Sequence, residues 1–296
     1  MADEKNVPVR QVDILKKTLS SESIKEQFQK ALGENSDVFV ASVIDLYTGD
    51  EQLKLCNPNL IVAQALKAAV LKLPINKALG HAYIVSYNIS VKKPDNTYEK
   101  VPTPVFMIGY KGYIQLAMRT GQYRIINADV VYEGEFRTKN KLTGEYDFNG
   151  EKTSNKIIGY FAYFELLNGF TKTVYTTVEE MAAHAKRYSA GIKFNKDVTV
   201  DSLITLANSG QIGTQVGWLG NFTDMALKTD LRNLISKWGY ISIEMQRAFD
   251  SDREDETEVE NAVPTSSIKK VDIQDVSFTD ETGKTVPPVP SNEAPY

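Results

Sequence analysis

The sequence has few of the residues that build metal sites and disulfides. It contains one cysteine, Cys56, and two histidines, His81 and His184, which lie far apart in the chain. A single cysteine excludes an internal disulfide and fits a reducing cytosol, and this donor set makes a zinc site a poor interpretation. We expect Cys56 to be a buried, inert thiol and His184 to be an ordinary surface residue.

Long apolar runs are also missing. No stretch approaches the roughly 18 apolar residues that a membrane span requires. The N-terminus MADEKNVPVR is charged and has no apolar centre, so we expect no secretory signal, no membrane partner and a cytoplasmic location. Hydrophobic residues make up 42% of the 296 positions, which is an ordinary value for a globular chain with a sizeable core.

Nucleotide-binding motifs are absent or incomplete. Gly283-Lys284-Thr285 looks like the end of a phosphate loop, but Phe278 stands where the first glycine is required. The glycines near residue 110 do not form a dinucleotide-binding pattern, and they are better explained by close backbone approaches or element ends. We therefore expect no nucleotide cofactor.

One pair of carboxylates allows an enzymatic alternative. Glu133 and Glu135 flank Gly134 after an expected strand, and paired carboxylates hold metal ions in nucleases. The further acids and the histidine that such sites use are not obvious nearby, so we favour a turn with solvated carboxylates. We expect no catalytic residue and no metal.

Charge is distributed unevenly along the chain. The net charge is −4, and 12 acidic and 4 basic residues lie between Asp250 and Tyr296. This segment carries −8, which leaves +4 on residues 1–249. A basic body with an acidic tail is typical of nucleic-acid-binding proteins, although a solvated surface with a solubilising tail gives the same numbers.

Composition predicts a domain boundary near residue 250. SDREDETEVENAV is acidic and VPPVPSNEAPY is rich in proline, and neither buries enough apolar surface to offset chain entropy. We expect residues 1–249 to form the folded core and residues 250–296 to be a mostly disordered, proline-containing acidic tail. Within it, SIKKVDIQDVSF is either a linker or a docking motif.

Helical patterns occupy both ends of the core. Near the N-terminus, apolar residues recur close to the helical period, with Ser20-Ser21 as an interruption: Leu15, Leu19, Ile24, Phe28 and Leu32. Further helices are expected over 37–47 and 59–73, the latter opened by Asn57-Pro58. Near the other end, Thr177-x-x-Glu180 predicts a helix over 178–188, and an apolar face predicts one over 221–237 that Gly239 ends.

The middle of the chain has β-strand patterns. Residues 81–91 alternate, 92–100 are a polar loop, and 104–108 form a short strand, which predicts a long hairpin with basic residues Lys92 and Lys93 at its tip. A short helix over 112–120, a strand over 123–132 and a hairpin around Asn168-Gly169 follow. The sequence therefore predicts an α+β fold with a helical N-terminal part, a central antiparallel β-sheet with hairpins, and C-terminal helices.

Three segments combine cations with aromatic or polar groups, as nucleic-acid grooves do. In the first, Gln115 and Arg119 lie one turn apart on the expected helix, Lys111 continues that face, and Tyr110 precedes it. Its apolar residues are expected to face the core: Ile114, Leu116 and Met118. An ordinary amphipathic helix is the alternative.

The second and third segments lie in the C-terminal part. Lys186, Arg187 and Tyr188 are followed by a flexible turn with Lys193, which suits phosphate binding, although a helix dipole alone also favours cations there. In the third segment, basic residues lie one turn apart on the polar face of the last helix, where Asp230 dilutes the patch: Lys228 and Arg232. The polar stretch 208–217 resembles a mobile loop.

These segments resemble the RecT family of phage single-strand annealing recombinases over about residues 53–249. The blocks that carry the resemblance are Ala78-Leu79-Gly80-His81-Ala82-Tyr83, residues 108–121, residues 225–232 and residues 241–248. The basic positions of the family pattern fall on Lys111, Arg119, Lys228 and Arg232, while Asn233 stands where a second base often follows.

The resemblance implies a non-enzymatic, ATP-independent protein that binds single-stranded DNA and pairs it with a complementary strand to give an annealed duplex. It also implies a homo-oligomer in rings or helical filaments, a partner exonuclease and contact with a host single-strand-binding protein. The acidic tail is expected to serve partner contacts. Three alternatives stay open: a passive single-strand-binding protein, a metal-dependent nuclease using the two glutamates, and a structural phage protein.

Overall fold

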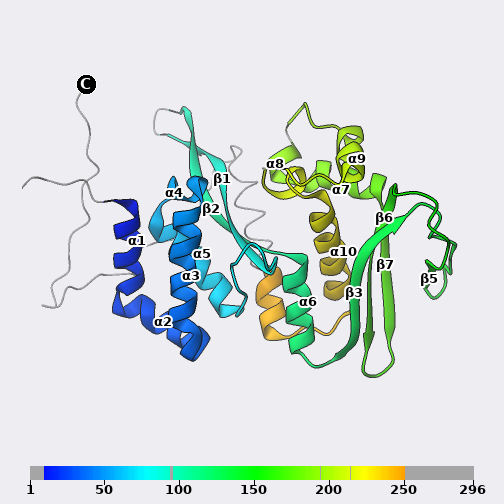
Figure 1. Ribbon diagram of the computed structural model, residues 1–296, viewed down its shortest axis with the longest axis horizontal. Coiled ribbons are helices and arrows are strands. Elements are labelled where there is room, and N and C mark those ends of the chain that lie inside the picture. Colours follow the sequence, from blue (N-terminus) through cyan, green and yellow to red (C-terminus); the bar gives the residue numbers. More distant parts are fainter. Residues whose placement is uncertain (1–9, 94–95, 194, 214, 251–296) are drawn as a thin grey trace, which may run out of the picture. The chain divides into compact units, whose positions relative to one another are not determined.

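The computed structural model describes residues 10–93, 96–193, 195–213 and 215–250 (Figure 1). The expected tail beyond residue 250 and Gly283-Lys284-Thr285 lie outside the described residues. Within them, no helix is both long enough and apolar enough to cross a bilayer.

The N-terminal part is helical, as predicted. Its helices are α1 (Gln11–Ser20), α2 (Glu22–Leu32), α3 (Ser36–Gly49), α4 (Glu51–Lys54) and α5 (Pro58–Val70). The interruption expected at Ser20-Ser21 is real, because Ser21 has extended backbone angles between α1 and α2. Asn57 caps α5 by accepting a hydrogen bond of 2.9 Å from the amide of Asn59, and Pro58 is the first residue of this helix.

The first hairpin pairs β1 (Ala82–Lys92) with β2 (Tyr98–Ile108) over their whole lengths, from Ala82 opposite Ile108 to Lys92 opposite Tyr98. A long hairpin is confirmed, but the strand expected over 104–108 begins six residues earlier. The distal part of β2 is exposed and its base is buried. The distal half of β2 is therefore held in place by backbone hydrogen bonds to β1 rather than by burial of its side chains. Because its side chains are not buried, this half shows no hydrophobic alternation in the sequence.

The second sheet has three antiparallel strands in the order β3-β6-β7. They are β3 (Tyr123–Tyr132), β6 (Ile157–Leu166) and β7 (Thr171–Thr177), preceded by α6 (Tyr110–Arg119). The turn at Asn168-Gly169 is confirmed, and Gly169 takes a φ of +83° there. A small hairpin of β4 (Thr138–Lys139) and β5 (Tyr146–Asp147) interrupts the chain between β3 and β6.

The C-terminal helices are α7 (Val178–Tyr188), α8 (Ala190–Lys193), α9 (Val200–Ser209) and α10 (Phe222–Trp238). The capping box of Thr177 and Glu180 is present at α7, and Gly239 ends α10. Neither α8, in place of the expected flexible turn, nor α9 was predicted. Helix α10 packs against α6, β3, β6 and β7, which places it beside the sheet in Figure 1. The order of helices, antiparallel sheets and helices confirms the α+β class.

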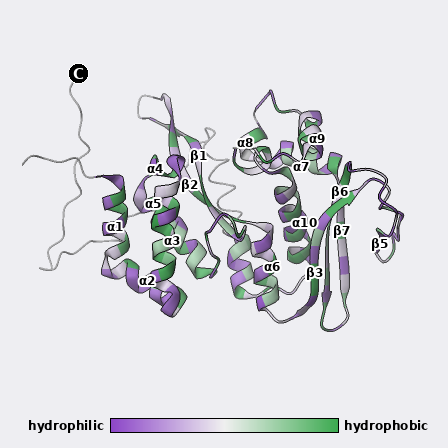
Figure 2. Ribbon diagram, in the orientation of Figure 1, coloured by the Kyte–Doolittle hydropathy of each residue, from purple (hydrophilic) through white to green (hydrophobic). Residues whose placement is uncertain are grey.

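Two groups of buried residues form the core. The larger group joins the N-terminal helices to the base of the first hairpin, α6, the inner face of the sheet and the end of α10. The smaller group joins α7, α9 and the first half of α10. Figure 2 shows hydrophobic residues gathered along α3 and α10. Because α10 contributes to both groups, its position depends on the whole core.

Candidate nucleic-acid groove

A cavity of about 490 Å³ opens between the first hairpin and the C-terminal helices; we call it the groove. Four parts of the chain supply its walls: β1 and β2, α7 with α8, the turn η2 (Gly217–Leu219) with the residues before it, and α10. Lys228, Arg232 and His184 line it, and none of its described lining residues is a carboxylate. The groove therefore suits an anionic ligand better than a cationic one.

Aromatic rings form one wall, running from the surface into the core. Tyr188 is 53% exposed, and its ring centroid lies 4.9 Å from that of His184. His184 lies 6.4 Å from Trp218, which is 6% exposed and contacts Phe222 at 5.1 Å. Such a series offers an outer ring for stacking on a nucleic-acid base and an inner set that holds it in place.

His184 is not the ordinary surface residue that the sequence predicted. It is half-buried between Tyr188 and Trp218 and lines the groove. Burial lowers the pKa of the imidazole, and the nearby Arg232 cation lowers it further. His184 is therefore neutral at pH 7 and contributes a flat, uncharged face to the wall.

The first hairpin supplies another part of the groove lining. The Tyr87 hydroxyl lies 3.6 Å from the sulfur of Met107, and burial raises the pKa of Tyr87 to about 12. A Cβ added to Gly217, which has a φ of +70°, would lie 3.3 Å from this hydroxyl. Glycine thus lets the turn before Trp218 approach β1 closely. Asn88, next to Tyr87, is exposed and adds a side-chain amide.

Helix α10 supplies the groove's cations. Lys228 and Arg232 lie one turn apart there, with Thr229 and Asn233 beside them. The sequence placed both cations on a polar face of the last helix, and the structure buries part of that face, because Lys228 is only 7% exposed and α10 is covered on several sides. Burial in a groove makes each charge act through a lower dielectric than at an open surface.

Asp230 does not dilute this basic pair, as the sequence suggested. It is fully buried on α10 and accepts a hydrogen bond of 2.7 Å from the Thr176 hydroxyl on β7. Burial raises the pKa of Asp230 to about 7, and the Glu180 carboxylate contributes in the same direction. Asp230 faces the sheet and is absent from the groove lining.

The basic residues at the end of α7 have different roles. Lys186 donates hydrogen bonds to the carbonyls of Ile192, at 3.1 Å, and Asn195, at 2.6 Å. It therefore ties the end of α8 and the residues after it to α7. Arg187 is exposed and its guanidinium lies 5.2 Å from the Tyr188 ring centroid. Of this predicted group, Tyr188 lines the groove, whereas Arg187 and the exposed Lys193 lie beside lining residues.

The predicted residues of α6 lie outside the groove lining. Arg119 donates two hydrogen bonds of 2.8 Å, to the carbonyls of Leu71 and Lys72, and these carbonyls follow the end of α5. Its guanidinium therefore caps a helix terminus. Gln115 is half-buried. Met118, expected in the core, is 57% exposed, because the buried face of α6 runs through Gly112, Tyr113, Leu116 and Ala117.

Lys111 and Tyr110 belong to a second set of contacts at the start of α6. The Lys111 ammonium lies 5.8 Å from the Tyr110 ring centroid, and its stem passes over Gly80. Burial raises the pKa of Asp224 on α10, and the Lys111 charge partly offsets that rise. The backbone is tight here, since a Cβ at Gly109 would lie 2.2 Å from the Gly80 carbonyl oxygen.

The residues considered for enzymatic chemistry have structural contacts. Glu135 accepts a hydrogen bond from the Tyr132 amide at 2.7 Å, and Glu133 accepts one from the Ser154 hydroxyl at 2.8 Å. Among the described residues, no three His, Cys, Asp or Glu side chains are grouped to hold a metal ion. Cys56 is buried against Ser86, and burial raises the pKa of its thiol, as expected for an inert cysteine.

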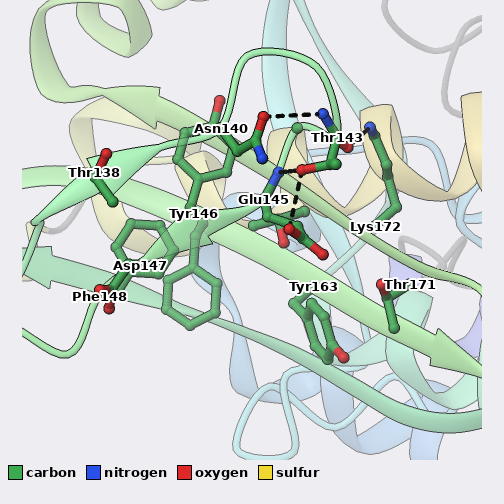
Figure 3. Close-up of a pocket in the computed structure, with 13 residues that line it drawn as sticks. Thr138, Asn140, Thr143, Glu145, Tyr146, Asp147, Phe148, Tyr163, Thr171 and Lys172 are labelled. Atoms are coloured by element: carbon green, nitrogen blue, oxygen red, sulfur yellow. Dashed lines mark hydrogen bonds between the residues drawn. The ribbon is translucent and has the colours of Figure 1, made fainter.

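A second cavity, of about 530 Å³, lies under the β4–β5 hairpin on the sheet (Figure 3). The polar groups at its rim form hydrogen bonds with one another. The Asn140 side chain accepts hydrogen bonds from the amides of Leu142 and Thr143, and Lys172 donates one to the Thr143 carbonyl. Its rings stack mutually, as Tyr146 does with Phe148. Carboxylates of Glu145 and Asp147 also line it, so it suits a nucleic-acid backbone less well than the groove does.

Sequence reasoning missed several groove residues. Tyr87 and Asn88 come from the first hairpin, Trp218 from the turn before α10, and Thr229 from α10 itself. The only signal for Trp218 is its position directly after the polar stretch 208–217, next to Gly217. No local pattern shows that these segments meet.

A cationic, aromatic groove on an α+β core is the arrangement of a nucleic-acid-binding protein. The RecT family pattern matches residues 37–265, and this chain belongs to the RecT family. It is 38% identical over 283 residues to the uncharacterized protein YqaK of Bacillus subtilis (strain 168), covering 95% of this chain and 87% of that protein. It is 27% identical over 212 residues to protein RecT of Escherichia coli (strain K12), covering 70% and 67%. Membership supports single-strand annealing recombination as the general activity.

Proposed function

We propose that this chain is an ATP-independent annealing protein that holds single-stranded DNA in the groove and pairs it with a complementary strand. The observation that carries the proposal is the groove lining, which combines Lys228, Arg232 and an aromatic wall and has no described carboxylate. Membership of the RecT family supports the same activity.

The groove residues have different roles in this proposal. Lys228 and Arg232 neutralise phosphates and release counterions, a contribution that is independent of base sequence. The exposed Tyr188 ring stacks on a base, and the exposed side-chain amide of Asn88 donates hydrogen bonds to sugar or phosphate oxygens. Binding by the backbone leaves the pairing edges of the bases available to a second strand.

Annealing needs no hydrolysis, because duplex formation between complementary strands is itself downhill. The protein lowers repulsion between two anionic backbones and keeps bases unpaired until they meet a complement. Sequence selectivity then comes from base pairing rather than from protein contacts, as in nucleic-acid-guided systems. No catalytic residue, metal or cofactor is part of this proposal.

The proposal also covers the assembly of this chain into oligomers and its contacts with other proteins. Residues 1–249 form the DNA-binding, annealing and oligomerising core, which assembles as a ring or helical filament and releases or holds the annealed duplex. Residues 250–296 serve contacts with an exonuclease that exposes the strand and with a host single-strand-binding protein, in the cytoplasm. Tyr110, Lys111, Gln115 and Arg119 stay predicted DNA contacts outside the groove.

The direct test is annealing of a fluorescent oligonucleotide with its quencher-labelled complement, with EDTA present and no nucleotide. We expect faster pairing than in the protein-free control, with both strands full length afterwards. Binding without faster pairing would instead make the chain a passive single-strand binder. Loss of strand length that requires magnesium would favour the nuclease alternative, and absence of any binding would contradict the proposal.

The groove assignment has its own test. Arg232→Gln should weaken binding of single strands and make the affinity less dependent on salt, because removing one cation reduces the number of released counterions by roughly one. Arg137→Gln is the matched control, because Arg137 is exposed in the segment between β3 and β4, outside the groove lining. Equal salt slopes in the two variants would remove Arg232 from the DNA site.

A further inference from the structure

The acidic tail begins beside the groove. Asp250, the last described residue, lines a small cavity together with Arg232, and Arg232 also lines the groove. The described chain therefore ends next to a side chain of the groove wall. Residues that follow Asp250 start within reach of the groove's cations.

The charge of the next segment complements the groove. Residues 252–260 contain six carboxylates and one base, Arg253, in nine positions. The carboxylates are Asp252, Glu254, Asp255, Glu256, Glu258 and Glu260. An extended chain spans about 3.3 Å per residue, so ten residues reach about 33 Å. This reach exceeds the dimensions of a 490 Å³ cavity.

We propose that residues 252–260 occupy the groove of their own chain when no nucleic acid is bound, so that an incoming strand must displace them. The inference rests on the proposed function, because it assigns a regulator to the same groove. Carboxylates take the place of phosphates beside Lys228 and Arg232, and the acidic tail acts as an intramolecular competitor.

The size of the effect follows from effective concentration. A short tether presents its end at millimolar concentration. At this effective concentration, a tail that binds the groove with a dissociation constant of about 0.1–0.5 mM weakens apparent DNA binding roughly threefold to tenfold. The tail contact is electrostatic, so salt weakens it, and the competition fades as ionic strength rises.

Two full-length variants separate docking from general repulsion between tail and DNA. The proximal variant carries Asp252→Asn, Glu254→Gln, Asp255→Asn, Glu256→Gln and Glu258→Gln. The distal variant carries Asp272→Asn, Asp275→Asn, Asp280→Asn, Glu281→Gln and Glu293→Gln. Each removes five negative charges, so any repulsion that depends only on net charge changes by a similar amount in both.

The readout is anisotropy of a labelled single-stranded oligonucleotide across a salt series. We expect the proximal variant to bind at least about threefold more tightly than the wild type at low salt, with the difference fading at high salt. The distal variant should stay close to the wild type. Equal tightening in the two variants, or none in the proximal one, would overturn the proposal.

A second measurement reports occupancy of the groove directly. The chain has two tryptophans, so Trp238→Phe leaves Trp218, which lines the groove, as the single reporter. Added to the proximal variant in this background, a synthetic peptide of residues 251–262 should shift the Trp218 emission and displace the oligonucleotide. The same peptide with amides in place of carboxylates should do neither.

The outcomes are distinguishable from failure of the proposed function. If the acidic peptide does not compete, the tail assignment is wrong while DNA binding stands. If competition in the wild type grows with protein concentration, the tail reaches a second copy and the same-chain proposal is wrong. If neither the wild type nor the proximal variant binds the oligonucleotide at any salt concentration, the proposed function itself fails.

Discussion

Replacing the buried Asp230 by asparagine should change how stability depends on pH. Asp230 has no exposed surface, and Thr176 donates a hydrogen bond to one of its oxygens. Asparagine keeps the shape and the accepting oxygen but cannot ionise. The variant therefore isolates the cost of holding a carboxylate inside the interface between α10 and β7.

The sign follows from the two protonation states. The folded-state pKa is about 7 against an ordinary value of 3.8, so the folded protein binds the proton more tightly than the unfolded chain does. Asp230 therefore contributes stability below pH 4 that is lost as pH rises through about 7. At about 1.4 kcal/mol per pKa unit, the loss between pH 5 and pH 8 is roughly 3 kcal/mol.

The assay is urea unfolding of the wild type and Asp230→Asn at several pH values between 5 and 8. We expect the free energy of unfolding to fall by roughly 3 kcal/mol more in the wild type than in the variant over this range. Other groups titrate in both proteins and cancel in the difference. Asp45→Asn, at an exposed position of α3, is the matched control. Parallel pH profiles for wild type and Asp230→Asn would refute a raised pKa at Asp230.

Three further predictions follow from single contacts. Arg119→Ala should lower the free energy of unfolding by about 2 kcal/mol, because it removes two charged hydrogen bonds to carbonyls; unchanged melting would place Arg119 in the DNA site alone. Gly112→Ala should destabilise the chain by at least about 2 kcal/mol in the same melting assay, since a Cβ would lie 2.2 Å from the His81 carbonyl oxygen, whereas Gly191→Ala, with open space around it, should be nearly neutral. Tyr188→Ala should weaken single-strand binding by about 1–3 kcal/mol in titrations without lowering the melting temperature; unchanged affinity would remove Tyr188 from the site.

Local signals predicted the elements that they directly specify. Asn57-Pro58, the Thr177 capping box and Asn168-Gly169 each bond or bend the backbone within a few residues, and each stands where the sequence placed it. Helix α9 also begins with a capping box, from Thr199 to Ser202, which the polar composition of the following stretch obscured. Its buried Leu203 and Ala207 give too short a stripe to stand out.

Burial of polar groups could not be predicted, because it depends on partners distant in the chain. Lys228 lies on the polar face that the sequence predicts for the last helix, yet it is only 7% exposed, because α10 is covered by α6 and by the three strands of the second sheet. Arg119 caps carbonyls 47 and 48 residues away. His184 meets Trp218 only because α7 and the turn before α10 fold together. Cation spacing predicted candidate DNA residues on three segments, but the groove contains only some of them.

Helix α10 couples stability to binding, because it turns Asp230 toward the sheet and Lys228 and Arg232 toward the groove. A strand held in the groove should therefore stabilise the folded chain. A ligand at 100 times its dissociation constant adds about 2.7 kcal/mol, so a saturating oligonucleotide should raise the melting temperature of the wild type. At the same oligonucleotide concentration, Arg232→Gln should show a smaller rise, while Arg137→Gln should match the wild type. A full shift in Arg232→Gln would mean that DNA stabilises the chain from a different surface, and the predicted contacts on α6 would then be the first place to look.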